Sequence, residues 1–127
     1  MSTLSIETTD GRTAFEPGEE VELDLQWELE EAPETLELRL VWNTSGKGTT
    51  DIEIARTEPI DEPSASGRIR KTIRLPRSPY SFSGKLVAII WALELVALPK
   101  EESTRLEIVI GPGNAEVRFG DPLAEFA

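Results

Sequence analysis

Apolar and polar residues alternate with a period of two along most of the chain. From Val21 to Leu29 every odd position is apolar, and the even positions between them are polar. Successive side chains of a β-strand point to opposite faces, so this segment is predicted to be a strand with one face in the core and the other in water. The alternation returns over residues 36–42 and 68–75. No segment repeats apolar residues at helical spacing, and the sequence therefore predicts an all-β protein.

Turn residues separate the predicted strands. Loops are expected at 32–34, at 43–50 and at 58–67, because these segments are rich in glycine, proline and small polar residues. The remaining strands are expected at residues 4–8, 52–54, 85–95 and 105–110. About seven strands with turns between them are typical of an antiparallel, immunoglobulin-like β-sandwich.

The length of 127 residues predicts a single domain. We expect the sandwich to occupy residues 1–113, because Gly111-Pro112-Gly113 closes the last predicted strand. Residues 114–127 are expected to form a C-terminal tail, which either folds back onto the sandwich or is mobile.

Two stretches carry opposite charge. Between Glu16 and Glu37 there are ten acidic and no basic residues, and between Arg68 and Lys85 there are six basic and no acidic residues. The basic run can be interpreted as a binding stripe. The interpretation we favour is that segment 20–28 pairs antiparallel with segment 68–74, with the outward charges of the two strands attracting one another.

The three tryptophans share the apolar phase of their strands. Trp27, Trp42 and Trp91 each have apolar neighbours two residues away. They are predicted to pack between the sheets, since burying large aromatic side chains dominates a small core. A sugar-stacking platform would need them on an outward face.

The same phase predicts an apolar strip on the outside. If Trp91 faces inward, Ile90 and Ala92 face outward, and Val41 and Val109 occupy the matching phase of the strands expected beside them. An exposed strip of this kind marks an interface, to be covered by the tail, a second copy of the chain or a partner protein. Tyr80 and Phe82 lie in a predicted loop and are further candidates for a contact surface. The candidate interface residues are therefore Val41, Tyr80, Phe82, Ile90, Ala92 and Val109.

The composition disfavours several kinds of site and partner. The chain has no cysteine and no histidine, so it lacks thiolate ligands and the commonest general base. Its net charge of −11 opposes binding to nucleic acid and to anionic membranes. The N-terminus has no signal-peptide pattern, and the longest apolar run, residues 86–98, is too short to span a bilayer. The predicted compartment is the cytoplasm, with no membrane insertion.

Candidate catalytic and metal motifs are incomplete. Residues 45–50 lack the first glycine of a phosphate-binding loop and the Ser or Thr that follows its lysine. Most carboxylates follow the regularly alternating outward phase of strands, and neither Asp51/Glu53 nor Asp61/Glu62 has the spacing of a calcium loop. The sequence therefore predicts no catalytic residue, no metal site and no cofactor, and the chain is not expected to be an enzyme.

Two stretches combine turn residues with strand patterns in a distinctive order. The first is Phe15-Glu16-Pro17-Gly18-Glu19-Glu20-Val21, which is similar to the entry into an arrestin strand and is followed by Leu36–Trp42. The second contains Ile73-Arg74-Leu75-Pro76, the turn Ser78–Gly84 and the strand Ile90–Leu95, in an order that arrestins share. Together with Val41–Gly48, this second stretch resembles small uncharacterised prokaryotic members of the fold.

The resemblance spans residues 13–110 and implies an arrestin-like, immunoglobulin-like sandwich without a cofactor. Arrestins contain two such sandwiches and this chain has the length of one. The polar-core residues of arrestins have no match here, so receptor or phosphate recognition is not implied.

The expected function is a non-catalytic protein–protein interaction domain, an adaptor or scaffold whose partner is another protein or a second copy of the chain. The alternatives are a carbohydrate- or small-ligand-binding sandwich and a purely structural domain of a larger complex.

Overall fold

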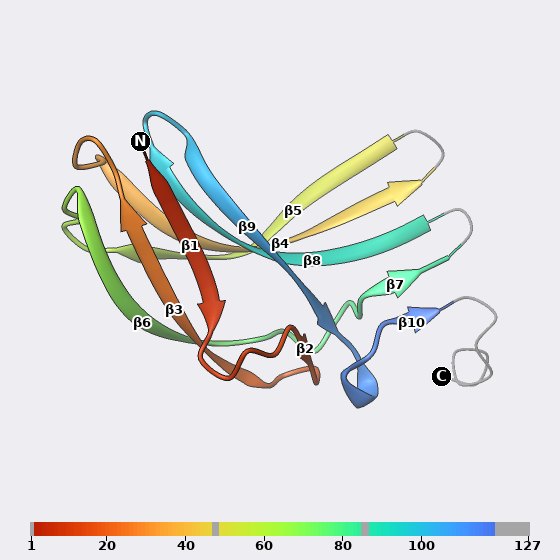
Figure 1. Cartoon of the computed structure of the whole chain (residues 1–127). Helices are drawn as coiled ribbons and strands as arrows, with labels where there is room; N and C mark the ends of the chain where they lie inside the picture. Colours follow the sequence, from red (N-terminus) through yellow and green to blue (C-terminus); the bar gives the residue numbers. More distant parts are fainter. Residues whose placement is uncertain (1, 47–48, 85–86, 119–127) are drawn as a thin grey trace.

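Two β-sheets face one another across an apolar core in the computed structural model, which describes residues 2–46, 49–84 and 87–118 (Figure 1). The smaller sheet has the order β1-β3-β6 and is antiparallel throughout. Its strands are β1 (Thr3–Thr8), β3 (Glu20–Glu28) and β6 (Ser66–Arg74).

The larger sheet has the order β10-β7-β8-β4-β5, and β9 pairs with β8 on the side opposite β4. Its strands are β4 (Thr35–Gly46), β5 (Thr49–Ile60), β7 (Phe82–Ser83), β8 (Val87–Leu98), β9 (Glu102–Ile110) and β10 (Val117–Arg118). The short β2 (Ala14–Phe15) runs parallel to β9, and a 3₁₀ turn, η1 (Pro112–Asn114), follows β9. The prediction of an all-β, antiparallel sandwich is confirmed.

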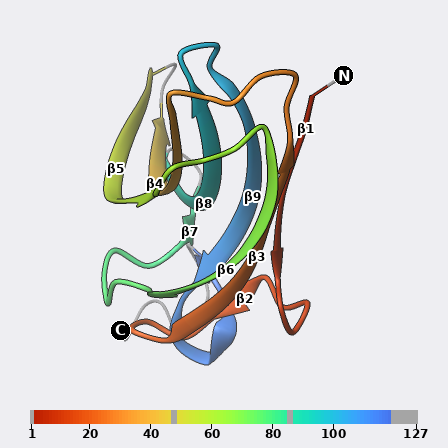
Figure 2. The same cartoon turned by 90° about the vertical axis from the view of Figure 1, so that its left-hand side faces the viewer.

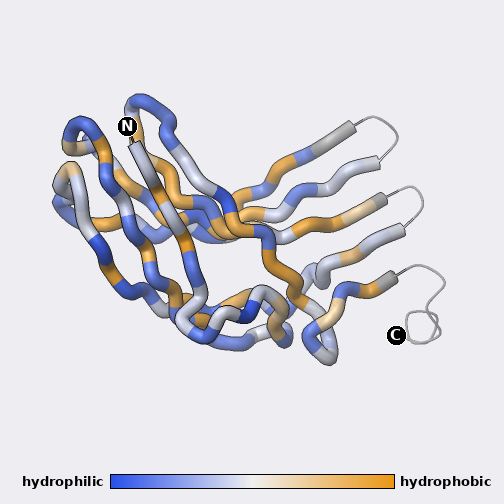
Figure 3. The backbone as a smooth tube through the Cα atoms, viewed as in Figure 1, coloured by the Kyte–Doolittle hydropathy of each residue, from blue (hydrophilic) through white to orange (hydrophobic). Residues whose placement is uncertain are grey.

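The core lies between the sheets, and its residues are the ones that the alternation assigns to the inward phase. Among the largest fully buried side chains are Leu23 and Leu25 of β3, Leu38 of β4, and Trp91 and Leu93 of β8. In Figure 3 apolar and polar segments alternate along the strands of both sheets. Burial of this contiguous apolar surface is what holds the two sheets together.

The tryptophans differ in how far they are buried. Trp27 and Trp91 are in the core, and each indole donates a hydrogen bond, Trp27 to the Ser64 carbonyl at 2.9 Å and Trp91 to the Pro79 carbonyl at 2.8 Å. Trp42 packs against Trp91, with 6.1 Å between the ring centroids, but it is only half-buried. The prediction of a core position is therefore confirmed for Trp27 and Trp91 and only partly correct for Trp42.

The half-burial of Trp42 has a simple geometric cause. The far halves of β4, β5 and β8, together with β7 and β10, continue beyond the smaller sheet (Figure 1). In the described part of the chain no strand of the smaller sheet faces this extension, and from Trp42 to Gly46 every residue of β4 is only half-buried. Burial here is decided by the length of the opposite sheet and not by the phase of the strand.

Two predicted loops are shorter in the structure. Segment 43–50 was expected to be a loop, but β4 continues to Gly46 and β5 begins at Thr49. Ladder pairing on both sides of β4 holds this segment extended, since Asn43 lies opposite both Ile52 and Ile90. The expected loop 58–67 begins only after Ile60. Pro59 is tolerated in β5 because this strand lies at the sheet edge.

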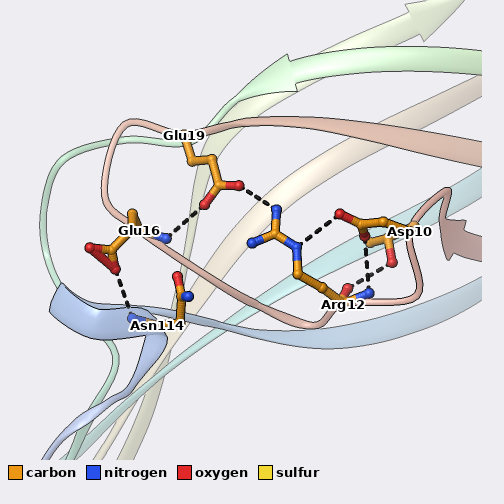
Figure 4. A network of polar contacts seen from close by, with 6 residues as sticks. Asp10, Arg12, Glu16, Glu19 and Asn114 are labelled. Atoms are coloured by element: carbon orange, nitrogen blue, oxygen red, sulfur yellow. Dashed lines mark hydrogen bonds and ion pairs between the residues drawn. The ribbon is translucent and has the colours of Figure 1, made fainter.

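A polar network joins the loops at the β2 end of the sandwich (Figure 4). Arg12 forms ion pairs with Asp10, at 2.8 Å, and with Glu19, and its guanidinium lies 5.0 Å from the Phe15 ring centroid. Glu16 accepts a 2.7 Å hydrogen bond from the Asn114 backbone N–H, which ties η1 to the loop before β3. The hydrogen bonds from Arg12 lower the pKa of both Asp10 and Glu19.

Candidate interaction surfaces

The outer face of the smaller sheet is a ladder of paired charges. β3 and β6 are antiparallel neighbours, with Glu20 opposite Arg74 and Asp24 opposite Arg70. The Arg70 Nε donates to Asp24 at 3.0 Å, and Arg74 Nη2 lies 2.5 Å from Glu20. Hydrogen bonding to Asp24 raises the pKa of Arg70. The predicted pairing of the acidic and basic strands is confirmed, and the basic run is largely sheet architecture.

The outer face of the larger sheet combines apolar and charged residues. Directly opposite residues share a face, and the register places Ile54, Val41 and Ala92 side by side on β5, β4 and β8. The adjacent row consists of Ile52, Asn43 and Ile90 on the same three strands. The outward phase predicted for Ile90, Ala92 and Val41 agrees with this register.

The predicted exposure of Val41 and Ala92 is wrong, since their relative exposures are 1% and 0%. The Arg105 side chain accounts for the burial of Ala92. Arg105 of β9 lies opposite Glu94 of β8 and donates to it at 3.1 Å through Nη1. The Arg105 Nη2 reaches on to Asn43 Oδ1 on β4, at 2.9 Å. To span from β9 to β4, this side chain must cross β8 above Ala92. The aliphatic stem of an arginine covers apolar surface while its charge stays solvated.

What remains exposed on this face is a group of three isoleucines, here named the outer apolar patch. Ile52, Ile54 and Ile90 have relative exposures of 63%, 53% and 37%. Ile52 and Ile54 lie on β5, the end strand of the larger sheet, which in the described part of the chain pairs only with β4. The patch therefore adjoins a strand edge whose backbone groups have no strand partner there.

Sequence reasoning missed Ile52 and Ile54 as surface residues. Their alternation with Asp51 and Glu53 in a predicted strand was the available signal. That signal did not say which face is covered, because the answer depends on β5 being an edge strand.

The other predicted interface residues do not join the outer apolar patch. Phe82 lies opposite Ile89, which alternation puts on the face opposite to Ile90, and it is half-buried. Tyr80 is exposed at 39% in the turn before β7. Val109 is half-buried and lies beside Ala14 of β2.

The first part of the predicted tail extends the sheet. Val117 pairs with Phe82 in the parallel β10–β7 ladder, and its backbone N–H donates to the Ser81 carbonyl at 2.8 Å. This places the tail residue Val117 in the plane of the larger sheet and not across its outer face. Phe119 and the rest of the tail lie outside the described residues.

Two further features concern chemistry and membranes. Among the described residues, no group of three acidic side chains is placed to hold a metal ion. Within the same ranges, the structure contains no helix with the length and apolar character needed to cross a membrane.

Comparison with known proteins shows the fold. No family model and no curated protein sequence matches the chain. Among solved structures it is similar to Spo0M, a sporulation control protein from Bacillus subtilis, with a TM-score of 0.59, 17% identity and 87% of this chain covered. Spo0M has an arrestin-like fold, and the sandwich described here is of that type. The chain spans about half of Spo0M, since the match covers 49% of that protein.

A β-glucosidase from Listeria innocua, solved in complex with gluconolactone, also matches, with a TM-score of 0.47, 12% identity and coverage of 87% of this chain but 16% of the enzyme. A likeness this weak carries no argument about activity.

Proposed function

We propose that this chain is a non-catalytic protein–protein interaction domain, an adaptor or scaffold whose partner is another protein or a second copy of the chain. The supporting observation is the outer apolar patch, where Ile52, Ile54 and Ile90 are exposed together beside the free edge of β5. Aliphatic side chains grouped on one face beside an unpaired strand form a surface that a partner protein can cover.

The patch suits a partner that offers apolar side chains to the sheet face. Burying the exposed parts of three isoleucines removes apolar area from water, which stabilises a complex. Arg105 and Glu94 form a hydrogen-bonded polar border on β9 and β8, and Arg105 also donates to Asn43, which lies between Ile52 and Ile90. Protein interfaces usually combine apolar contacts with such polar groups.

The alternative, a carbohydrate- or small-ligand-binding sandwich, has less support. Such a site stacks sugars on exposed aromatic rings, and the large exposed apolar residues of the described chain include only one aromatic, Tyr80. Trp27 and Trp91 are in the core and are unavailable for stacking.

Site-specific photo-crosslinking in the native cell tests the proposal. A photoreactive phenylalanine analogue replaces Ile54 in one variant and Thr72, an exposed residue on the outer face of the smaller sheet, in the matched control. We expect position 54 to crosslink to one discrete protein, position 72 not to do so, and Ile52→Lys to reduce the crosslink at position 54. Equal crosslinking at both positions would contradict the proposal, and a product of twice the chain mass would identify a second copy as the partner.

A further inference from the structure

A second surface lies on the open flank of the sandwich, between the edge strands of the two sheets. β6 ends the smaller sheet, β5 ends the larger sheet, and a recess of about 400 Å³ opens between them. Figure 2 views the sandwich from a side on which both strands are visible. Ligand pockets are typically about 300–1,000 Å³, so the recess has the size of a binding site.

The recess has an apolar floor and a basic rim. Leu40 and Leu75, which are 3% and 2% exposed, form the floor, and half-buried Pro76, exposed Ala55 and three arginines line the rest. We name it the arginine groove, defined by Leu40, Ala55, Arg56, Arg74, Leu75 and Arg77. Its lining contains no carboxylate, in a chain of net charge −11. A local excess of cations on an acidic protein needs an explanation beyond solubility.

A β-bulge shapes one wall of the arginine groove. Leu40 pairs with Arg56 and Val41 with Ile54, which leaves Ala55 of β5 without a partner on β4. The extra residue of a bulge bends its strand and re-aims the following side chains. Because of this extra residue, Arg56 lies on the same inward side of the sheet as Leu40. Its side chain therefore faces the flank and not the outer face of the sheet.

A turn before β3 holds the opposite wall. The Gly18 carbonyl accepts a 3.0 Å hydrogen bond from Arg74 Nη1, and the Gly18 N–H donates to the Pro76 carbonyl at 3.2 Å. Gly18 has a φ of 78°, in the left-handed region that favours glycine. A Cβ atom there would lie 3.4 Å from Arg77 Cγ, so the stem of Arg77 packs closely over this turn.

The three guanidinium groups differ in how far they are neutralised. Arg74 pairs with Glu20, and Arg56 pairs with Glu58. Arg77 makes no ion pair or side-chain hydrogen bond with any residue in the described ranges. Each guanidinium carries five N–H donors, so all three retain donors for an incoming anion.

We infer that the arginine groove binds an extended acidic peptide segment of another protein. Carboxylates would meet Arg77 and the free donors of Arg56 and Arg74, and a neighbouring aliphatic side chain would contact the Leu40 and Leu75 floor. The segment is extended because the groove runs between two edge strands, where added strands find backbone partners. Ala55, left unpaired by the bulge, lies at this edge.

The arginine groove is a different site from the outer apolar patch, so binding at each site can be tested separately. Ile52 and Ile54 are on the outward phase of β5, whereas Arg56 is on the inward phase. Substitutions on one face of β5 therefore leave the other face in place.

Two blocked hexapeptides serve as probes, one alternating leucine and glutamate and the other alternating leucine and glutamine. Binding is measured by fluorescence polarisation and by shifts of the backbone amide signals in NMR spectra. We expect the glutamate peptide to bind at least about tenfold more tightly, because a hydrogen bond to a charged group is stronger than one between neutral groups. The Ala55 amide should shift on titration.

Variants with matched charge changes locate the binding. Arg77→Gln should lower the affinity for the glutamate peptide about tenfold. Arg68→Gln removes the same charge from the outer face of the smaller sheet, at a side chain 65% exposed, and should change the affinity less than about twofold. Ile54→Lys should leave peptide binding intact, which separates this inference from the proposed function.

Three results would overturn the inference. If the two peptides bind with equal affinity, or if Arg77→Gln leaves the affinity unchanged, the groove is not an acidic-peptide site. Complete competition by inorganic phosphate at an equal concentration would define a small-anion site instead. A concentration-dependent dimer in sedimentation analysis that Arg77→Gln abolishes would make a second copy of the chain the occupant.

Discussion

The two outer faces of the sandwich follow the same alternating pattern and have opposite character. On the smaller sheet, outward carboxylates of β3 lie beside outward arginines of β6. On the larger sheet, Arg105 bridges Glu94 and Asn43 across Ala92, while three isoleucines stay exposed. On the first face the described charges pair within the sheet, and on the second apolar area stays exposed.

The difference shows that an outward phase does not define a surface residue. Ala92 and Ile90 are both outward residues of β8, yet one is fully buried and the other is 37% exposed. A long side chain from the adjacent strand decides between them. The arginine groove adds a third kind of surface, in which cations and apolar residues meet at a flank between the sheets.

The largest expected effect on stability comes from truncating a side chain of the core between the two sheets. Trp91→Ala should lower the free energy of unfolding by about 3–5 kcal/mol, since it empties a large, fully buried site and deletes an indole hydrogen bond. Urea denaturation measures the change. Phe82→Ala, at a half-buried position, should cost clearly less, and an equal loss would contradict the assignment of Trp91 to the core centre.

Ala92→Leu tests whether Arg105 closes the outer face of the larger sheet. The added methyl groups have no space beneath the arginine stem, and the expected loss is about 1–3 kcal/mol of unfolding free energy. Gln26→Leu places the same new side chain at an exposed position on the outer face of the smaller sheet, where solvent leaves room for it, and should stay within about 0.5 kcal/mol. If the two variants unfold at the same urea concentration, Arg105 is not a rigid cover.

Asp24→Asn tests the charge ladder. Asp24 accepts the hydrogen bond from Arg70 Nε and lies 3.7 Å from Arg68 Nη2, so its neutralisation should cost about 0.5–1 kcal/mol. The loss should shrink as salt is added, because salt screens surface charges. Glu28→Gln, opposite Ser66, is the control and should be nearly neutral. A salt-independent loss in Asp24→Asn would argue against an electrostatic origin.

The smallest expected effect on stability is that of Ile90→Lys. Ile90 is partly exposed on the outer apolar patch, so the unfolding free energy should change by less than about 0.5 kcal/mol. Crosslinking from position 54 should nevertheless decrease, because the charge disrupts the patch. Thermal unfolding of the variant checks the first expectation, and a strongly destabilised protein would show that Ile90 belongs to the core.

Much of the fold is visible in the alternation and charge of the sequence. The inward phase of β3 correctly identifies Val21, Leu23, Leu25 and Trp27 as core residues. Opposite charges correctly pair β3 with β6, since side chains on adjacent strands lie close enough to attract. These properties depend on residues near in sequence or on a pairing that charge alone can select.

Tertiary structure alone decided which of the outward and inward residues are covered. Arg105 reaches Asn43, 62 residues away in sequence, and buries Ala92 on the way. Trp42 is only half-buried although its phase is inward, and Ile52 and Ile54 are exposed on the edge strand β5. The arginine groove joins Arg56 of β5 with Arg74 and Arg77 at the end of β6. Strand periodicity gives the direction of a side chain, but its cover depends on strand order, sheet length and the reach of distant residues.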